Sequence, residues 1–388
     1  MSRIAAWGWG KGIDSREAGR LAGQQALSRL GTTRATLGLV FISQEFDIGQ
    51  VISGLTGVLG EVPLWGISTS RPFTPAGEQS RSVAVGLMAG SDISAEASFW
   101  PGFSQNSSEV AKQLLQALSL DPTSISGLLL AADGINGDIS QVCAALTGSP
   151  AVVAGCLATG DILQAKTSQI AGSQFGSGSL AMMTLKGPLS IGTGVGHGWR
   201  DVGVNFEISK ARDIWVQELG NMPAAEAYSR TFGYTAREWA FPPLKEMVRL
   251  YPLGIELAAG SKELIIRSPL QVEVDGSLRM NIPVAEGQVA RLLVGDRDAC
   301  LEAAREAARS AIAGLKGAKP ALALALVDQA WQFIFQSEPA RLMATIKAEM
   351  GEIPLVGGYT LGQVCRQGTQ GIIRAYNQNI LLVVFGES

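Results

Sequence analysis

The sequence predicts an α/β fold of three related units with mixed sheets, each running strand, helix, strand, helix, strand, strand. Three continuous apolar runs, 37–43, 127–133 and 321–328, are typical of strands buried on both faces. A stretch with helical character precedes each run, and a proline, apolar and glycine pattern follows it. Because these features recur in the same order, the chain indicates an internal repeat.

The first two units span about 3–90 and 93–186. The first opens with the short strand "RIAAWGWG", and Asp14 with Glu17 three residues on predicts a capped helix start. The second opens with "AEASFW", and its helix carries apolar residues at i, i+3, i+4 and i+7 from Ala111. The two units end in the apolar strands "SVAVGLMAG" and "GSLAMMTL".

The third unit spans about 288–386 and is expected to start with the strand "VARLLVG" and end with "NILLVVFG". The segment 187–287 is inserted before it. Alternation of apolar and polar residues around Asp275-Gly276 predicts a β-hairpin in this insertion. We therefore divide the chain into an N-terminal domain, 1–200, with two units, and a C-terminal domain, 201–388, with the insertion and the third unit.

Glycine-rich segments follow the central strands at 62–70, 149–161 and 353–363. Ligands of parallel sheets bind outside the carboxyl ends of the strands, and glycine lets the backbone approach them closely. The segments are interpreted either as tight turns or as loops that wall one or two shared cavities.

Composition excludes several classes of protein. The net charge is −3, which argues against a nucleic-acid partner. The longest apolar runs are shorter than the roughly 18 residues of a membrane helix, and the start of the chain lacks the apolar region of a signal peptide. We expect a cytoplasmic protein without membrane insertion, whose four cysteines are free thiols.

His197, in "GTGVGHGWR", is the only histidine of the chain. A chain with one histidine cannot form a zinc site that needs two, and we predict no metal site. Three interpretations stay open: a loop residue beside Trp199 and Arg200, a general base paired with Cys156, or a haem ligand. The glycines around it do not form a dinucleotide-binding motif, because no typical β-α-β unit follows.

The order of several segments resembles the FIST family. They include "PLWGISTS", "VVAGCLATGD", "GPLSIGTGVGHGWRDVG" and "PLVGGYTLGQV". The resemblance covers nearly the whole chain and implies an N-terminal and a C-terminal FIST domain. It also implies a sensory role with a small ligand, such as an amino acid or a similar small metabolite. The chain departs from the family pattern at Gln363 and Asn377, which puts the usual ligand specificity in question.

The sequence hypothesis is thus a stand-alone, intracellular small-molecule sensor that signals through a separate protein such as a kinase. No cofactor is expected, and the purified protein should show no haem absorption. The alternatives are a haem-based gas sensor, an uncharacterised enzyme that uses Cys156, Asp161 or Asp133, and an adaptor without a ligand.

The expected ligand-binding residues come from the three glycine-rich segments and from the arginine beside His197. They are Ser68, Thr69, Gly155, Cys156, Asp161, Arg200, Tyr359 and Gln363. Arg200 is expected to hold a ligand carboxylate through its planar guanidinium. The alternative is that Arg200 pairs internally with an acid such as Asp161 or Asp201.

Overall fold

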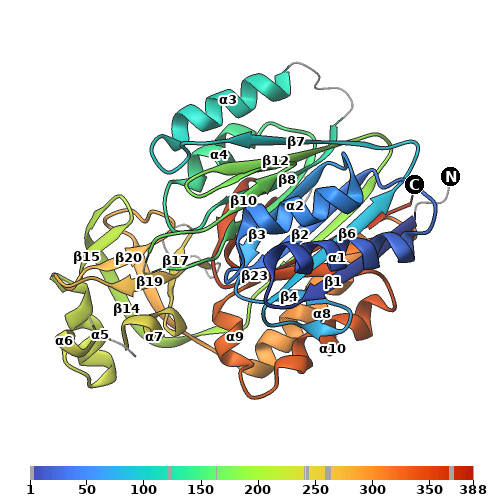
Figure 1. Cartoon of the computed structure of the whole chain (residues 1–388). Helices are drawn as coiled ribbons and strands as arrows, with labels where there is room; N and C mark the ends of the chain where they lie inside the picture. Colours follow the sequence, from blue (N-terminus) through green and yellow to red (C-terminus); the bar gives the residue numbers. More distant parts are fainter. Residues whose placement is uncertain are drawn as a thin grey trace. The chain divides into compact units, whose positions relative to one another are not determined.

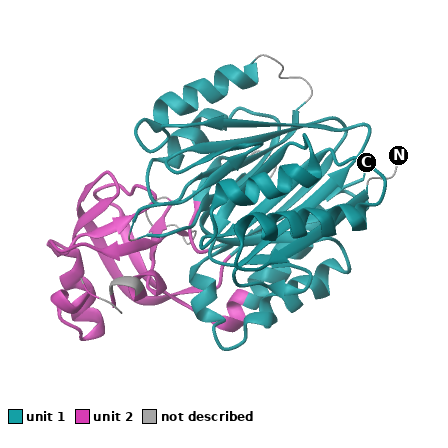
Figure 2. Ribbon diagram, in the orientation of Figure 1, with its two compact units in different colours: residues 1–196, 301–375, 379–388 teal, residues 197–300, 376–378 magenta. Residues whose placement is uncertain are grey.

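The computed structural model describes residues 4–119, 125–162, 164–239, 241, 244–257, 264–366 and 371–387. The chain forms two compact units, coloured separately in Figure 2. Unit 1 comprises residues 1–196, 301–375 and 379–388, and unit 2 comprises residues 197–300 and 376–378.

Unit 1 contains two sheets, and the first has the strand order β1-β6-β2-β3-β10-β11 (Figure 1). In that order its strands are β1 (Ile4–Lys11), β6 (Ser82–Ala89), β2 (Leu37–Ser43), β3 (Leu64–Thr69), β10 (Gln169–Ala171) and β11 (Gln174–Gly176). Helices α1 (Ser15–Leu30) and α2 (Ile48–Leu59) share one apolar cluster with this sheet. Asp14 caps α1 by accepting a hydrogen bond of 2.7 Å from the Glu17 backbone N–H, so the predicted helix start is confirmed.

The second sheet of unit 1 has the order β13-β25-β22-β23-β9-β8-β12-β7. In that order its strands are β13 (Ser190–Gly196), β25 (Ile380–Gly386), β22 (Pro320–Asp328), β23 (Leu355–Arg366), β9 (Val152–Ala158), β8 (Ile125–Asp133), β12 (Leu180–Lys186) and β7 (Ser94–Trp100). Three short strands pair beside this path: β4 (Pro72–Thr74), β5 (Gly77–Glu78) and β24 (Ile373–Tyr376). The helices that accompany it are α3 (Ser107–Ser119), α4 (Ile139–Leu146), α8 (Arg297–Ala313), α9 (Ala330–Ile334) and α10 (Pro339–Met350).

The two sheets of unit 1 pack against each other through their inner faces. A side-chain carbon at Gly86 would lie 2.6 Å from Val356 Cγ2, and one at Gly358 would lie 3.0 Å from the Phe41 ring. Because helices cover the other face of the first sheet, its central strand is buried on both sides. This burial explains the continuous apolar runs in the sequence.

The predicted strands 37–43, 127–133 and 321–328 are confirmed as central strands. They form β2, β8 and β22, and each lies between one parallel and one antiparallel neighbour. The strand order is the same in three groups, β1-β6-β2-β3, β7-β12-β8-β9 and β13-β25-β22-β23. The mixed α/β fold is therefore confirmed, while superposition of the three units stays a prediction.

The prediction that the third unit starts with the strand "VARLLVG" was wrong. The segment "VARLLVG" forms β21 (Val289–Gly295), which pairs with β14 (Trp199–Arg212) and β17 (Leu253–Glu256) in unit 2. The place that β1 and β7 hold in the first two groups is taken in the third by β13, which pairs with β25. Consequently the inserted segment is 197–300 rather than 187–287. In the sequence it follows β13 and ends within the first turn of α8.

Glycines explain why β13 takes this place. Side-chain carbons at Gly192 and Gly194 would lie 1.9 Å from the carbonyl oxygens of Ala311 and Ala307 in α8. Only glycine lets the helix approach the strand this closely. The same arrangement occurs where Gly10 of β1 meets the Ala18 carbonyl of α1, also at 1.9 Å. The G-x-G pattern near His197 is thus a helix-packing surface.

Unit 2 is built on an antiparallel sheet of order β18-β17-β21-β14-β15-β20-β19. Its other strands are β15 (Trp215–Leu219), β16 (Met222–Pro223), β18 (Leu264–Arg267), β19 (Pro269–Val272) and β20 (Leu278–Met280). Its helices are α5 (Ala224–Phe232), α6 (Ala236–Trp239), α7 (Leu244–Met247) and η1 (Val248–Leu250). The predicted hairpin is confirmed, since β19 and β20 pair around a turn in which Gly276 has a φ of 85°.

None of the helices in the described part of the chain is long and apolar enough to cross a membrane.

Candidate functional site

A polar cavity of about 430 Å³ opens in unit 1 at the carboxyl ends of the parallel strands β2 and β3. Its walls come from the segment after β2, the start of α2, the end of β3, the loop after β9, and β11. The lining residues are Gln44, Phe46, Asp47, Ile48, Gly49, Ser68, Gly160, Asp161, Gln164, Lys166, Thr167, Ser168, Phe175, Gly176 and Ser177. The position agrees with the general rule that ligands of α/β sheets bind at the carboxyl ends of strands.

Ser68 joins two walls of this cavity. Its Oγ donates a hydrogen bond of 2.7 Å to the Thr159 carbonyl and accepts one of 2.8 Å from the Ser168 backbone N–H. The Ser68 backbone N–H donates in turn to the Ser168 carbonyl at 2.9 Å. The loop that follows β9 is therefore held against the end of β3.

Three charged side chains surround the cavity. Asp47 caps α2 by accepting a hydrogen bond of 2.8 Å from the Gln50 backbone N–H. Asp161 accepts one of 3.0 Å from the Gln164 backbone N–H, and its backbone pairs with that of Lys166. Lys166 is exposed and forms no ion pair with any residue in the described ranges. Both signs of charge thus face one small volume, which suits a zwitterionic ligand.

Of the predicted ligand-binding residues, the structure brings Ser68 and Asp161 together at this cavity. The three glycine-rich segments are mostly strands rather than loops, but the ends of two of them, at Ser68 and at Gly160-Asp161, line the cavity. Gly155 and Cys156 lie inside β9, and the other two segments form β3 and β23.

The reason is packing between neighbouring strands. A side-chain carbon at Gly155 would lie 2.3 Å from the Leu130 carbonyl oxygen of β8. Gly66 and Gly357 hold equivalent places in β3 and β23, each with a carbonyl oxygen at 1.9 Å. These glycines permit strands to approach one another.

Thr69 and Tyr359 are buried between the sheets of unit 1, where both make hydrogen bonds to protein atoms. The Thr69 hydroxyl donates to the Tyr359 carbonyl at 2.9 Å. The Tyr359 hydroxyl donates to Glu78 Oε2 at 2.9 Å, and its ring packs edge-on against Phe73. Burial and the Glu78 carboxylate both raise the pKa of Tyr359, so its hydroxyl stays a hydrogen-bond donor.

Gln363 also contacts protein atoms on both sides of its amide. Its Nε2 donates to Thr360 Oγ1 at 2.8 Å, and its Oε1 accepts from the Asn379 backbone N–H at 3.2 Å. Asn377 belongs to unit 2, where its Nδ2 donates to Asn281 Oδ1 at 2.9 Å. The two positions that depart from the family pattern therefore hold structural hydrogen bonds.

Arg200 and His197 lie in unit 2. Arg200 is 67% exposed and pairs with Asp296 at 3.3 Å, whereas Asp201 pairs with Arg291 at 3.2 Å. Internal pairing of Arg200 therefore occurs, with an acid other than the two expected. His197 is exposed, and its Nδ1 accepts the Trp199 backbone N–H at 3.3 Å. Partial desolvation by the surrounding protein lowers the pKa of His197.

Sequence reasoning missed most of the cavity. Gln44, Asp47, Lys166 and Ser168 line it but were not among the predicted residues. One signal was available for Asp47, because a capping aspartate between a buried strand and the next helix marks the carboxyl edge of the sheet. The approach of the 164–168 loop to β3 left no comparable signal in the sequence.

The four cysteines are free and buried. Burial raises the pKa of Cys156, and it raises the pKa of Cys300 and of Cys365 to about 12. Because only the thiolate is nucleophilic, we expect these buried thiols to react slowly in the folded protein at neutral pH.

We therefore expect less than one thiol per chain to react with Ellman's reagent at pH 8 in the native protein. All four should react after guanidinium denaturation. A single thiol that reacts rapidly in the native state, and disappears in Cys156→Ser, would contradict this expectation and favour an enzyme that uses Cys156.

The cavity and the fold define the class of protein: a mixed α/β protein with a small polar cavity at strand ends and buried, free thiols. The chain matches the FIST N domain over residues 36–222 and the FIST C domain over residues 224–366. It belongs to the FIST family, whose domains are associated with small-ligand sensing and signal transduction.

No curated protein matches the chain. Among solved structures, it is similar to a cyanuric acid hydrolase from A. caulinodans, with 11% identity over 100% of both chains and a TM-score of 0.37. It is also similar to PurLQS from Thermotoga maritima, with 10% identity over 100% of this chain and 72% of that chain, and a TM-score of 0.25. Both likenesses are distant.

Proposed function

We propose that this FIST protein is a stand-alone intracellular sensor that binds a small zwitterionic metabolite, such as a free amino acid, in the polar cavity of unit 1. Occupancy of the cavity is passed on to a separate signalling protein, for example a kinase. The observation that carries the proposal is the cavity itself, with Asp47, Asp161 and Lys166 around it. Its volume lies within the range of about 300–1,000 Å³ usual for small-molecule sites.

The charges assign a place to each end of such a ligand. The ammonium group lies toward Asp47 and Asp161, and the carboxylate lies toward Lys166. The Ser168 hydroxyl adds a polar group to the same wall, and Phe46 and Phe175 offer apolar surface to a side chain. The buried sheets behind Ser68 supply a rigid base, because well-packed strands position side chains more accurately than loops do.

The test is a thermal-shift screen of the twenty amino acids, followed by calorimetry on any that raises the melting temperature. We expect at least one to bind, and Asp161→Asn and Lys166→Gln to weaken its binding at least tenfold, or about 1.4 kcal/mol. Both substitutions remove a charge and leave a polar side chain, and Asp161→Asn also preserves shape. Mass spectrometry of small molecules released on denaturation of the purified protein identifies ligands outside the panel.

Matched controls are Lys210→Gln and Arg200→Gln, which remove exposed cations in unit 2. Both should leave the affinity unchanged. Loss of binding in Arg200→Gln with full binding in Lys166→Gln would move the site to unit 2. Absence of any bound or released small molecule would contradict the sensory proposal, as would turnover of a bound molecule, which indicates an enzyme. The absence of haem absorption also stays a prediction, tested by the spectrum of protein expressed with haem precursor.

A further inference from the structure

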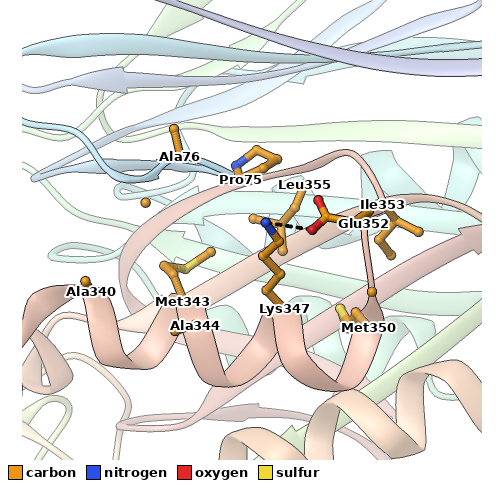
Figure 3. A pocket seen from close by; sticks show the side chains of 12 residues that line it. Pro75, Ala76, Ala340, Met343, Ala344, Lys347, Met350, Glu352, Ile353 and Leu355 are labelled. Carbon is orange, nitrogen blue, oxygen red and sulfur yellow. Dashed lines mark ion pairs between the residues drawn. The ribbon is translucent and has the colours of Figure 1, made fainter.

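A second cavity, of about 230 Å³, lies in unit 1 between α10 and the hairpin formed by β4 and β5 (Figure 3). Its lining is mostly apolar: Pro75, Ala76, Gly77, Ala340, Met343, Ala344, Lys347, Met350, Gly351, Glu352, Ile353 and Leu355. It shares no residue with the polar cavity.

One face of α10 forms the floor of this cavity. Ala340, Met343, Ala344 and Lys347 follow the i, i+3, i+4, i+7 spacing that places residues on one side of a helix. Figure 3 shows Met343 and Lys347 rising from α10 toward Pro75 of the hairpin. Two small alanines on this face leave space that larger side chains would fill, so the cavity exists because of the local sequence.

The buried wall of the cavity consists of apolar side chains, two of which are flexible methionines. Met343 and Met350 are 7% exposed, and Leu355 is 5% exposed. Methionine side chains are flexible and make favourable contacts with aromatic rings. Since an apolar cavity of about 150 Å³ holds benzene in another protein, this volume accommodates a ring with a short side chain.

The charged side chains among the lining residues are Lys347 and Glu352, which form an ion pair. Lys347 Nζ lies 2.8 Å from Glu352 Oε1, and the two side chains are 47% and 81% exposed. An ion pair so exposed to water contributes little, so an incoming carboxylate can replace Glu352 on the lysine. The more deeply placed member of the pair is the cation, and the cavity therefore favours an anionic ligand.

We propose that this cavity is a second ligand site, which takes a small monocarboxylate with an apolar, aromatic body. The ring lies between Met343, Met350 and Leu355, and the carboxylate pairs with Lys347. The proposal stands apart from the proposed function, because it concerns other residues and another class of ligand.

The test uses 3-phenylpropanoate, with 3-phenylpropan-1-ol and 3-phenylpropylamine as neutral and cationic probes of the same shape, and calorimetry of the full chain. We expect the acid to bind at least tenfold more tightly than the alcohol and the amine. Lys347→Gln should reduce the affinity of the acid to that of the alcohol and leave the alcohol unchanged. Glu352→Gln should tighten binding of the acid several-fold, because it removes the competing carboxylate.

A matched pair of substitutions tests the location. Ala344→Trp fills the cavity and should abolish binding of the acid, whereas Ala348→Trp lies on the same helix outside the cavity and should leave it unchanged. Absence of acid binding to the wild-type chain overturns the proposal, and so does equal binding by the two tryptophan variants or preference for the amine. Asp161→Asn should not affect this binding, which separates the result from that of the polar cavity.

Discussion

Replacing Asp133 by alanine is expected to lower the free energy of unfolding by about 3 kcal/mol. Asp133 ends the central strand β8 and is 3% exposed. Its Oδ1 accepts the backbone N–H groups of Ile135 and Asn136 at 2.8 and 3.0 Å. Its Oδ2 accepts Gly178 N–H at 2.8 Å and the Ser177 hydroxyl at 3.3 Å. Alanine leaves these donors without a partner, and buried donors without a partner are costly.

Urea unfolding followed by tryptophan fluorescence measures this loss. Asp133→Asn keeps one acceptor oxygen and should lose less stability. The comparison variant is Asp138→Ala, which removes the half-buried cap of α4 and should cost only about 1 kcal/mol. Equal stability of Asp133→Ala and the wild type would contradict the structural role, and reopen the hypothesis that this carboxylate has a chemical one.

Replacing Gly357 by alanine is expected to cost about 3 kcal/mol or more, because the added carbon overpacks the sheet. It would lie 1.9 Å from the Ala325 carbonyl oxygen, a backbone atom that cannot move aside alone. Gly66 stands in the equivalent place against Val40, also at 1.9 Å, and should respond in the same way.

The control is Gly57→Ala in α2, where the new carbon meets no atom within 4 Å. Because alanine favours helices over glycine, this variant should gain up to about 1 kcal/mol. Thermal unfolding of both proteins measures the difference, and recovery of Gly357→Ala only as insoluble protein agrees with the expectation. A melting temperature at or above that of the wild type would show that β22 and β23 can separate without cost.

Local signals in the sequence correctly predicted several elements. Continuous apolar runs predicted β2, β8 and β22, since strands buried on both faces need no polar side. Asp14 with Glu17 predicted the start of α1, and Asp275-Gly276 predicted the turn between β19 and β20. Each of these features depends on residues adjacent in the chain or on burial alone.

The candidate site was only partly predictable. Ser68 and Asp161 line the polar cavity, whereas Thr69, Tyr359 and Gln363 do not line it and make hydrogen bonds to protein atoms. Their polar side chains looked like ligand contacts because a sequence shows hydrogen-bonding groups without their partners. The partners lie far along the chain, as with Thr69 and the Tyr359 carbonyl.

The sequence by itself determined the α/β class, the central strands, the cap of α1 and the hairpin, because neighbouring residues and apolar patterning control them. Only the tertiary structure decided that β13, rather than the more apolar β21, pairs with β25. That choice rests on Gly192 and Gly194 meeting the backbone of α8, more than one hundred residues away. Close approach between distant segments depends on three-dimensional shape, which the order of residues does not display.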